Sequence, residues 1–196
     1  MEFSTDNDAA LLLANRYLPS FQFSERHGIA LIKAPAAAIL AAARNFDDRR
    51  DRVVNALQAL REVPARLAVV LGRRNELAGR PRFGLADFFQ LEETDNEIAL
   101  GLIGQFWKLD YGLVHIKDAN AFLNFSAPGY GKLVMVWSVL PVEGGHRLLT
   151  ETRISCPDRR SRLLFSMYWV VIRLASGWIR RRILNQLKRD AEGAAA

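Results

Sequence analysis

Two strand-like runs followed by one long apolar segment form the C-terminal third of this chain of 196 residues. The apolar run Lys132–Leu140 ends at the turn Pro141–Gly145, and a second run, His146–Ser155, follows it. The segment Asp158–Asp190 then has the length and apolar content of a helix. Two strands that pair and then lead into one long helix are typical of a sheet wrapped around that helix. Such an arrangement leaves room for a cavity between the sheet and the helix.

The preceding residues begin with a predicted strand, Phe21–Ile32, and a helix that starts after Pro35. Helical spacing of Val53, Leu57 and Leu60 predicts a second helix, and residues 65–71 a short third one. Residues 85–93 and 97–107 then form a predicted β-hairpin, and residues 121–126 a short strand. We therefore expect an α+β fold, with strands and helices largely separated along the sequence.

The domain organisation follows from the extent of these elements. We expect an N-terminal extension over residues 1–20, a single domain over 21–190 and a disordered tail over 191–196. The acidic, polar N-terminus differs from a secretory leader, and the single cysteine, Cys156, excludes a disulfide within the chain. Both observations favour a cytoplasmic protein.

The net charge of +6 belongs to one segment, because Asp158–Asp190 alone carries +7. The rest of the chain is nearly neutral and contains no nucleic-acid-binding motif, so we expect no nucleic-acid partner. The histidines show no metal-ligand spacing, Cys156 has no companion cysteine, and the Gly129–Gly131 turn lacks the ending of a phosphate-binding loop. We expect neither a metal nor another cofactor.

Several stretches resemble an uncharacterised group of bacterial proteins in the START-like helix-grip superfamily, also called SRPBCC or polyketide cyclase/dehydrase and lipid-transport-like proteins. The similar stretches are Gly101–Trp107, Pro128–Lys132, Thr150–Arg153, Tyr168–Trp169 and Ile179–Arg181. The resemblance implies a helix-grip fold, in which a curved antiparallel sheet wraps around a long C-terminal helix. It also implies an apolar ligand site, and it brings no catalytic motif.

The predicted function is therefore binding of a small apolar or amphipathic ligand between the sheet and the helix Asp158–Asp190. Large apolar residues on the predicted elements are the candidates to line the cavity. They are Phe89, Leu102, Phe106, Trp107, Phe122, Phe125, Met135, Trp137, Tyr168, Trp169 and Ile172. Gly101 and Gly104 allow the strand before Phe106 to bend, either to open this cavity or simply to curve the sheet.

Three polar residues are further candidates for the site. Glu151 and Arg153 share one face of their strand, where they either anchor a polar ligand group or form an ordinary solvated pair, the interpretation we favour. His115 lies near Asp110 and Asp118 in the sequence. A histidine within hydrogen-bond distance of one of these carboxylates would suit acid–base chemistry. The resemblance to the START-like superfamily also permits an enzyme of the cyclase or dehydratase type, with these residues and Tyr168 as its candidates, and this is the alternative to a pure binding protein. Cys156 fits a small buried residue better than a nucleophile.

Two further alternatives concern surfaces. In the predicted strand Leu133–Leu140, the residues on both faces are apolar apart from Ser138. A helix, a ligand or the partner of a homodimer must therefore cover the second face. The C-terminal helix has a wide apolar stripe that includes Trp178, and we expect Arg173 and Arg180 on the opposite side, reaching to solvent. Leu163–Ile179 is seventeen residues long and is apolar except for Ser166, Arg173, Ser176 and Gly177. This is short for a membrane span, so we expect a packed helix, but binding of the arginine-rich helix to an anionic membrane surface or to a partner stays open.

Overall fold

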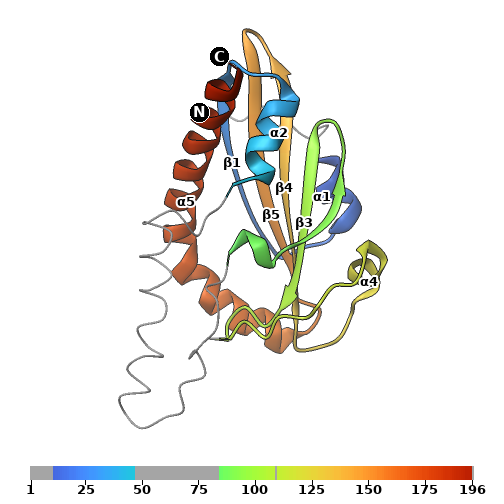
Figure 1. Cartoon of the computed structure of the whole chain (residues 1–196). Helices are drawn as coiled ribbons and strands as arrows, with labels where there is room; N and C mark the ends of the chain where they lie inside the picture. Colours follow the sequence, from blue (N-terminus) through green and yellow to red (C-terminus); the bar gives the residue numbers. More distant parts are fainter. Residues whose placement is uncertain (1–10, 47–83, 109, 196) are drawn as a thin grey trace.

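The computed structural model describes residues 11–46, 84–108 and 110–195. They form one antiparallel sheet of five strands in the order β1-β5-β4-β3-β2, with helices on both faces (Figure 1). This is the predicted α+β class. In chain order the elements are α1 (Leu12–Tyr17), β1 (Phe23–Ile32), α2 (Ala36–Arg44), the 3-10 turn η3 (Leu85–Asp87), β2 (Phe89–Glu93), β3 (Glu97–Gly104), α4 (Ala119–Asn124), β4 (Gly131–Val142), β5 (Gly145–Ser155) and α5 (Arg159–Ala195).

The centre of the sheet is the predicted hairpin of β4 and β5. Its register is continuous from Val142 opposite Gly145 to Lys132 opposite Ser155. Gly144 has φ +79 in the turn, a left-handed conformation that glycine adopts without strain. The early strand β1 then pairs with β5, with Phe23 opposite Ile154. The first and the last strand of the chain therefore lie side by side in the sheet.

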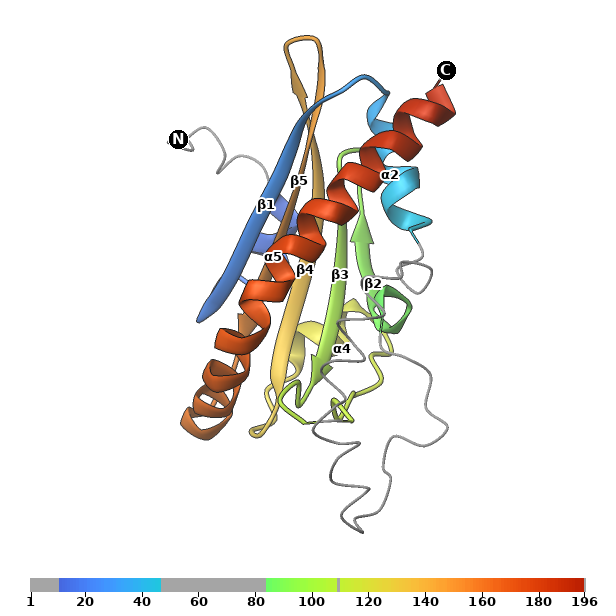
Figure 2. The same ribbon diagram turned by 90° about the vertical axis from the view of Figure 1, so that its left-hand side faces the viewer.

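Helix α5 crosses one face of the sheet diagonally, with α2 beside it (Figure 2). Its buried Ile183, Leu184 and Leu187 pack in one cluster with Ile39 and Leu40 of α2 and with the inward side chains of the strands. The helix begins after Asp158, whose carboxylate accepts hydrogen bonds from the backbone N–H of Ser161, its hydroxyl and the backbone N–H of Gly129. These bonds lower the pKa of Asp158 to about 2, so the cap remains charged at neutral pH.

Helix α1 covers the other face of the sheet, on the side opposite α5 in Figure 1. Leu11, Leu13, Ala14 and Leu18 pack there in a second cluster with Val134, Val136, Leu149 and Phe122. This settles why both faces of Leu133–Leu140 are apolar, because helices of the same chain cover both. Residues 11–18 are therefore more than an extension, since they supply five of the thirteen buried residues of this cluster.

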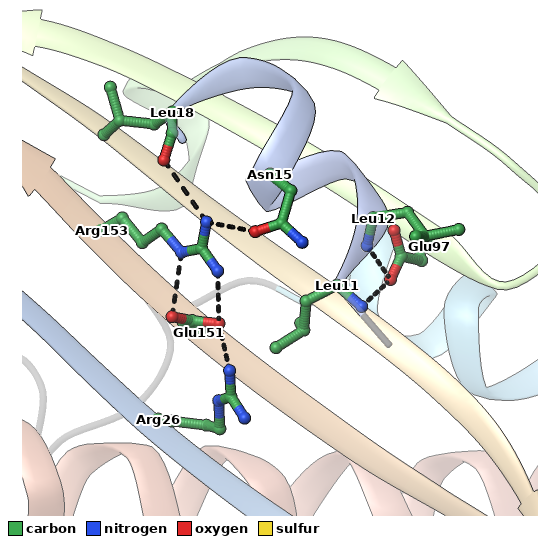
Figure 3. A network of polar contacts seen from close by, with 8 residues as sticks. All are labelled: Leu11, Leu12, Asn15, Leu18, Arg26, Glu97, Glu151 and Arg153. Atoms are coloured by element: carbon green, nitrogen blue, oxygen red, sulfur yellow. Dashed lines mark hydrogen bonds and ion pairs between the residues drawn. The ribbon is translucent and has the colours of Figure 1, made fainter. Parts of the chain in front are cut away.

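Polar contacts hold α1 in place (Figure 3). The Glu97 carboxylate accepts from the backbone N–H groups of Leu11, Leu12 and Leu13, at 2.5, 3.2 and 2.8 Å. Arg153 donates to Asn15 Oδ1 at 2.7 Å, and its Nε lies 3.0 Å from Glu151 Oε1. Glu97 thus satisfies N–H groups that a helix start leaves without intrahelical partners.

The expectation of a solvated Glu151–Arg153 pair is wrong. The two residues are 3% and 6% exposed and lie beneath α1, on the face away from α5. Arg26 from β1 adds a third charge, with Nη2 at 3.0 Å from Glu151 Oε2. Burial is tolerated because each charge has an opposite partner and further hydrogen bonds.

Two other local predictions differ from the structure. Residues 121–126 were expected as a strand, but Ala119–Asn124 is helix α4, because the Asp118 carboxylate accepts from the Ala121 N–H and starts a helical turn. A tail was expected from residue 191, yet α5 continues to Ala195 and Ala191 is buried. The helices predicted around Val53–Leu60 and over residues 65–71 lie outside the described residues.

Within the described ranges, every helix is too short or too polar to cross a membrane.

Candidate functional site

A buried polar cluster lies between α5 and the sheet. Arg180 of α5 donates through Nη1 to the Thr150 hydroxyl at 2.7 Å and through Nη2 to the Thr152 hydroxyl. Both threonines belong to β5 and are buried. Burial lowers the pKa of Arg180 to about 10, while the charge of nearby Glu25 raises it. Arg180 therefore keeps its positive charge at neutral pH inside the helix–sheet layer.

Glu25 and His27 of β1 complete this cluster. His27 Nε2 lies 2.8 Å from Glu25 Oε1, and both side chains are largely buried. A Cβ at Gly177 would lie 3.5 Å from Glu25 Oε1 and 3.7 Å from His27 Cε1, so α5 approaches β1 closely here. The five residues Glu25, His27, Thr150, Thr152 and Arg180 are called the inner polar cluster below.

An apolar pocket of about 310 Å³ lies on the same side of the sheet. Strand residues Ile98, Leu100 and Trp137 form its floor, and α2 and η3 form its walls. Its lining residues are Ala43, Arg44, Asn45, Phe46, Leu85, Ala86, Phe88, Gln90, Ile98, Leu100 and Trp137. Arg44 at the rim is paired with Glu93. This set of residues is called the α2 pocket below.

Strand register connects the α2 pocket to the inner polar cluster. Ile98 lies opposite Trp137, Trp137 opposite Thr150, and Thr150 opposite His27. One row across four strands therefore runs from the apolar floor of the pocket to the polar cluster. Neighbouring strands are about 4.8 Å apart, so the Trp137 and His27 positions are separated by about 10 Å. A molecule with an apolar body and a polar end matches this distribution.

A larger pocket of about 510 Å³ lies on the opposite face, beside α1. Arg16 and Glu92 on its rim already pair with each other, and Glu97 accepts the N–H groups of α1. Its charged groups are thus engaged in holding α1. We therefore take the α2 pocket, with its open apolar floor, as the candidate site.

The structure divides the predicted cavity residues between the two faces. Those in the core clusters of the α5 side are Leu102, Phe106, Trp107, Met135, Trp137, Tyr168 and Trp169. Phe89, Phe122 and Phe125 pack in the cluster beneath α1, so for them the prediction of a place between sheet and α5 is wrong. The side chain of Ile172 lies outside the described residues. Trp137 is the predicted residue that lines the α2 pocket.

Most of the predicted aromatic residues pack against one another. Phe165 of α5 contacts the rings of Phe23, Phe106, Tyr168 and Trp169, with ring centroids 4.8 to 6.1 Å apart. Edge-to-face and stacked contacts of this kind stabilise a core. These rings therefore fill the end of the helix–sheet layer near Phe165.

Of the three polar candidates predicted from sequence, Glu151 and Arg153 pair with each other, but His115 is not brought near them. Glu151 and Arg153 lie beneath α1, and His115 is exposed in the loop before α4. Asp118, expected near His115, instead caps α4. Glu151, Arg153 and His115 therefore do not form one site.

Arg180 is the site residue that the sequence reasoning missed, because it was expected to reach solvent. Two signals pointed to its inward position. Thr150 and Thr152 are polar residues on the strand face that also carries Leu148 and Ile154, and Gly177 lies one helical turn before Arg180. Polar residues on a helix-facing strand need a hydrogen-bonding partner from that helix.

Cys156 is buried, as the sequence indicated, and burial raises the pKa of its thiol to about 11, with Asp158 adding to the shift. At neutral pH we expect a disulfide exchange reagent to modify the native protein roughly a hundredfold more slowly than the unfolded chain. Absorbance of the released thiol, with and without guanidinium, measures both rates. Equal rates would show that Cys156 is accessible in solution.

Comparison with known proteins adds no identification, since no family model, curated protein or solved structure matches this chain.

Proposed function

We propose that this protein binds a small amphipathic molecule on the α5 side of its sheet. The apolar part occupies the α2 pocket, and the polar end points toward the inner polar cluster. The observation that carries this proposal is the row Ile98–Trp137–Thr150–His27, which joins an apolar pocket floor to a buried polar cluster on one face.

The size and chemistry of the pocket support this proposal. A volume of about 310 Å³ is at the lower end of the usual range for small-molecule sites, roughly 300–1,000 Å³. The lining is mainly aliphatic and aromatic, so removing an apolar ligand from water drives binding. Arg180 carries guanidinium N–H donors and His27 a ring nitrogen, which together suit a carboxylate or hydroxyl end.

We further propose that the fold is of the helix-grip type. Its support is the long C-terminal helix across one face of an antiparallel sheet, together with the sequence stretches that resemble the START-like superfamily. The ligand site then lies on the helix-covered face, although α2 and η3, rather than α5, supply the walls of the pocket among the described residues.

Filling the α2 pocket tests the ligand proposal. We expect a fluorescent fatty acid to bind the native protein, quench tryptophan emission and raise the melting temperature by mass action. Leu100→Trp places a larger side chain at the pocket floor and is expected to weaken binding at least about tenfold while the fold persists. Fluorescence titration gives the affinity, and circular dichroism checks the fold.

Leu123→Trp is the matched control, because Leu123 is exposed on α4 and lies outside the pocket. It should leave the affinity unchanged. The proposal would be contradicted if Leu100→Trp bound the fatty acid as strongly as the native protein, or if Leu100→Trp and Leu123→Trp lost the same amount of affinity. Gly104→Leu is unsuitable for this test, because a Cβ there would lie 2.7 Å from the Tyr111 carbonyl oxygen.

A further inference from the structure

The outward face of α5 carries an apolar stripe. Leu163, Met167, Val170 and Trp178 are exposed by 64%, 57%, 70% and 53%. Their spacing of four, three and eight residues places them on one side of a helix. Trp178 was expected to pack inside, so this stripe was not predicted from the sequence. Single exposed apolar residues are ordinary, but a row of four on one helix is a surface feature.

Arginines surround this stripe. Arg159, Arg160, Arg173, Arg181 and Arg189 are exposed, and the sequence contains no acidic residue from Arg159 to Arg189. The stripe thus lies on a helix whose charged residues from Arg159 to Arg189 are all positive. The opposite side of the helix is fixed to the sheet through Phe165, Ile183 and Leu187, which are buried. Helix α5 lies across one face of the sheet (Figure 2), and its exposed stripe therefore faces away from the sheet.

We propose that the outward face of α5 docks on an anionic membrane surface. In this arrangement the helix lies parallel to the bilayer, the apolar side chains enter the boundary between headgroups and acyl chains, and the arginines contact anionic headgroups. Trp178 is suited to this boundary, where amphipathic aromatic side chains are enriched. The helix lies on the membrane and does not cross it. The proposal is independent of the ligand site.

Charge and side-chain chemistry favour this occupant over two others. A second copy of the chain would bring two arginine-rich faces together, and like charges repel. Single-stranded nucleic acid would match the charge, but Leu163, Met167 and Val170 offer no aromatic face for stacking bases. An anionic lipid surface satisfies both the positive rim and the aliphatic centre.

Co-sedimentation with vesicles tests this proposal with the full-length protein. We expect binding to vesicles that contain phosphatidylglycerol, none to vesicles of phosphatidylcholine alone, and weaker binding at high salt because exposed charges are screened. Arg181→Gln should reduce binding about fivefold, the usual contribution of one basic residue near an anionic surface. Val170→Gln and Trp178→Gln should each reduce it further, because they remove inserted apolar area.

Lys117→Gln and Leu123→Gln are the matched controls, since both residues are exposed and lie away from α5. They should bind vesicles like the native protein. Tryptophan emission should shift to shorter wavelength on binding, and Trp178→Gln should remove most of that shift. Equal binding to both vesicle types, or equal losses of binding in the stripe variants and the control variants, would overturn the proposal. It would also be overturned if the protein failed to bind vesicles but instead self-associated or bound RNA, and the α5 variants abolished that activity.

Discussion

A chain that ends at Pro157, and so lacks α5, is expected not to fold cooperatively. Phe165, Ile183, Leu184 and Leu187 of α5 are buried against the sheet and α2. Burying each such side chain contributes about 1.5–3 kcal/mol, so these four together contribute about 6–12 kcal/mol. The whole stability of a domain is about 5–15 kcal/mol, so the loss matches or exceeds it. Thermal melting followed by circular dichroism measures the effect.

A shorter truncation is the control for this experiment. Removing the last three residues deletes Ala194 and Ala195, which are exposed at the end of α5, and should leave the melting temperature unchanged. A monomeric chain ending at Pro157 that still melts cooperatively would show that the sheet and its remaining helices form a sufficient core. The assigned role of α5 as the cover of the sheet would then be wrong.

Glu151→Ala is expected to destabilise the protein by about 3–5 kcal/mol, because it leaves buried charges without their partner. Glu151 Oε1 lies 3.0 Å from Arg153 Nε, and Oε2 lies 3.0 Å from Arg26 Nη2. Arg153 also donates to Asn15 and to the Leu18 carbonyl oxygen, so the change should loosen the attachment of α1 (Figure 3). Guanidinium unfolding gives the free energy of unfolding.

The exposed pair of Arg16 and Glu92 supplies the comparison. Arg16 is 62% exposed, and Arg16→Ala should change the free energy of unfolding by less than about 1 kcal/mol. Limited proteolysis near Pro19 should become faster in Glu151→Ala than in Arg16→Ala, because α1 is less firmly held. Similar stabilities for the two variants would mean that the buried network contributes no more than a surface pair.

Local elements of this fold were predictable because their signals lie within a few residues. The turn with Gly144 and Gly145 and the apolar runs on either side determine the β4–β5 hairpin. The change of period after Leu85 predicts β2 and β3. The Asp118 cap before α4 is also a local signal, but it was overlooked. Residues 121–126 were therefore wrongly predicted as a strand.

The candidate site was less predictable, because a strand pattern shows which residues share a face but not which helix covers it. Trp137 and Phe122 are equally large and apolar in the sequence, yet Trp137 lines the α2 pocket and Phe122 packs beneath α1. Likewise, an arginine on a long helix usually reaches water, and Arg180 turns inward because β5 presents two threonines to it.

The sequence by itself determined the five strands, helices α2 and α5, the buried Cys156 and the need for cover on both faces of β4. Tertiary structure decided that α1 provides the second cover, that β1 pairs with β5, and that Glu151 and Arg153 are buried while Leu163 and Trp178 are exposed. The physical reason is distance along the chain. Turns, caps and alternation act between near neighbours, whereas the packing of two faces depends on residues more than a hundred positions apart, such as Arg26 and Glu151.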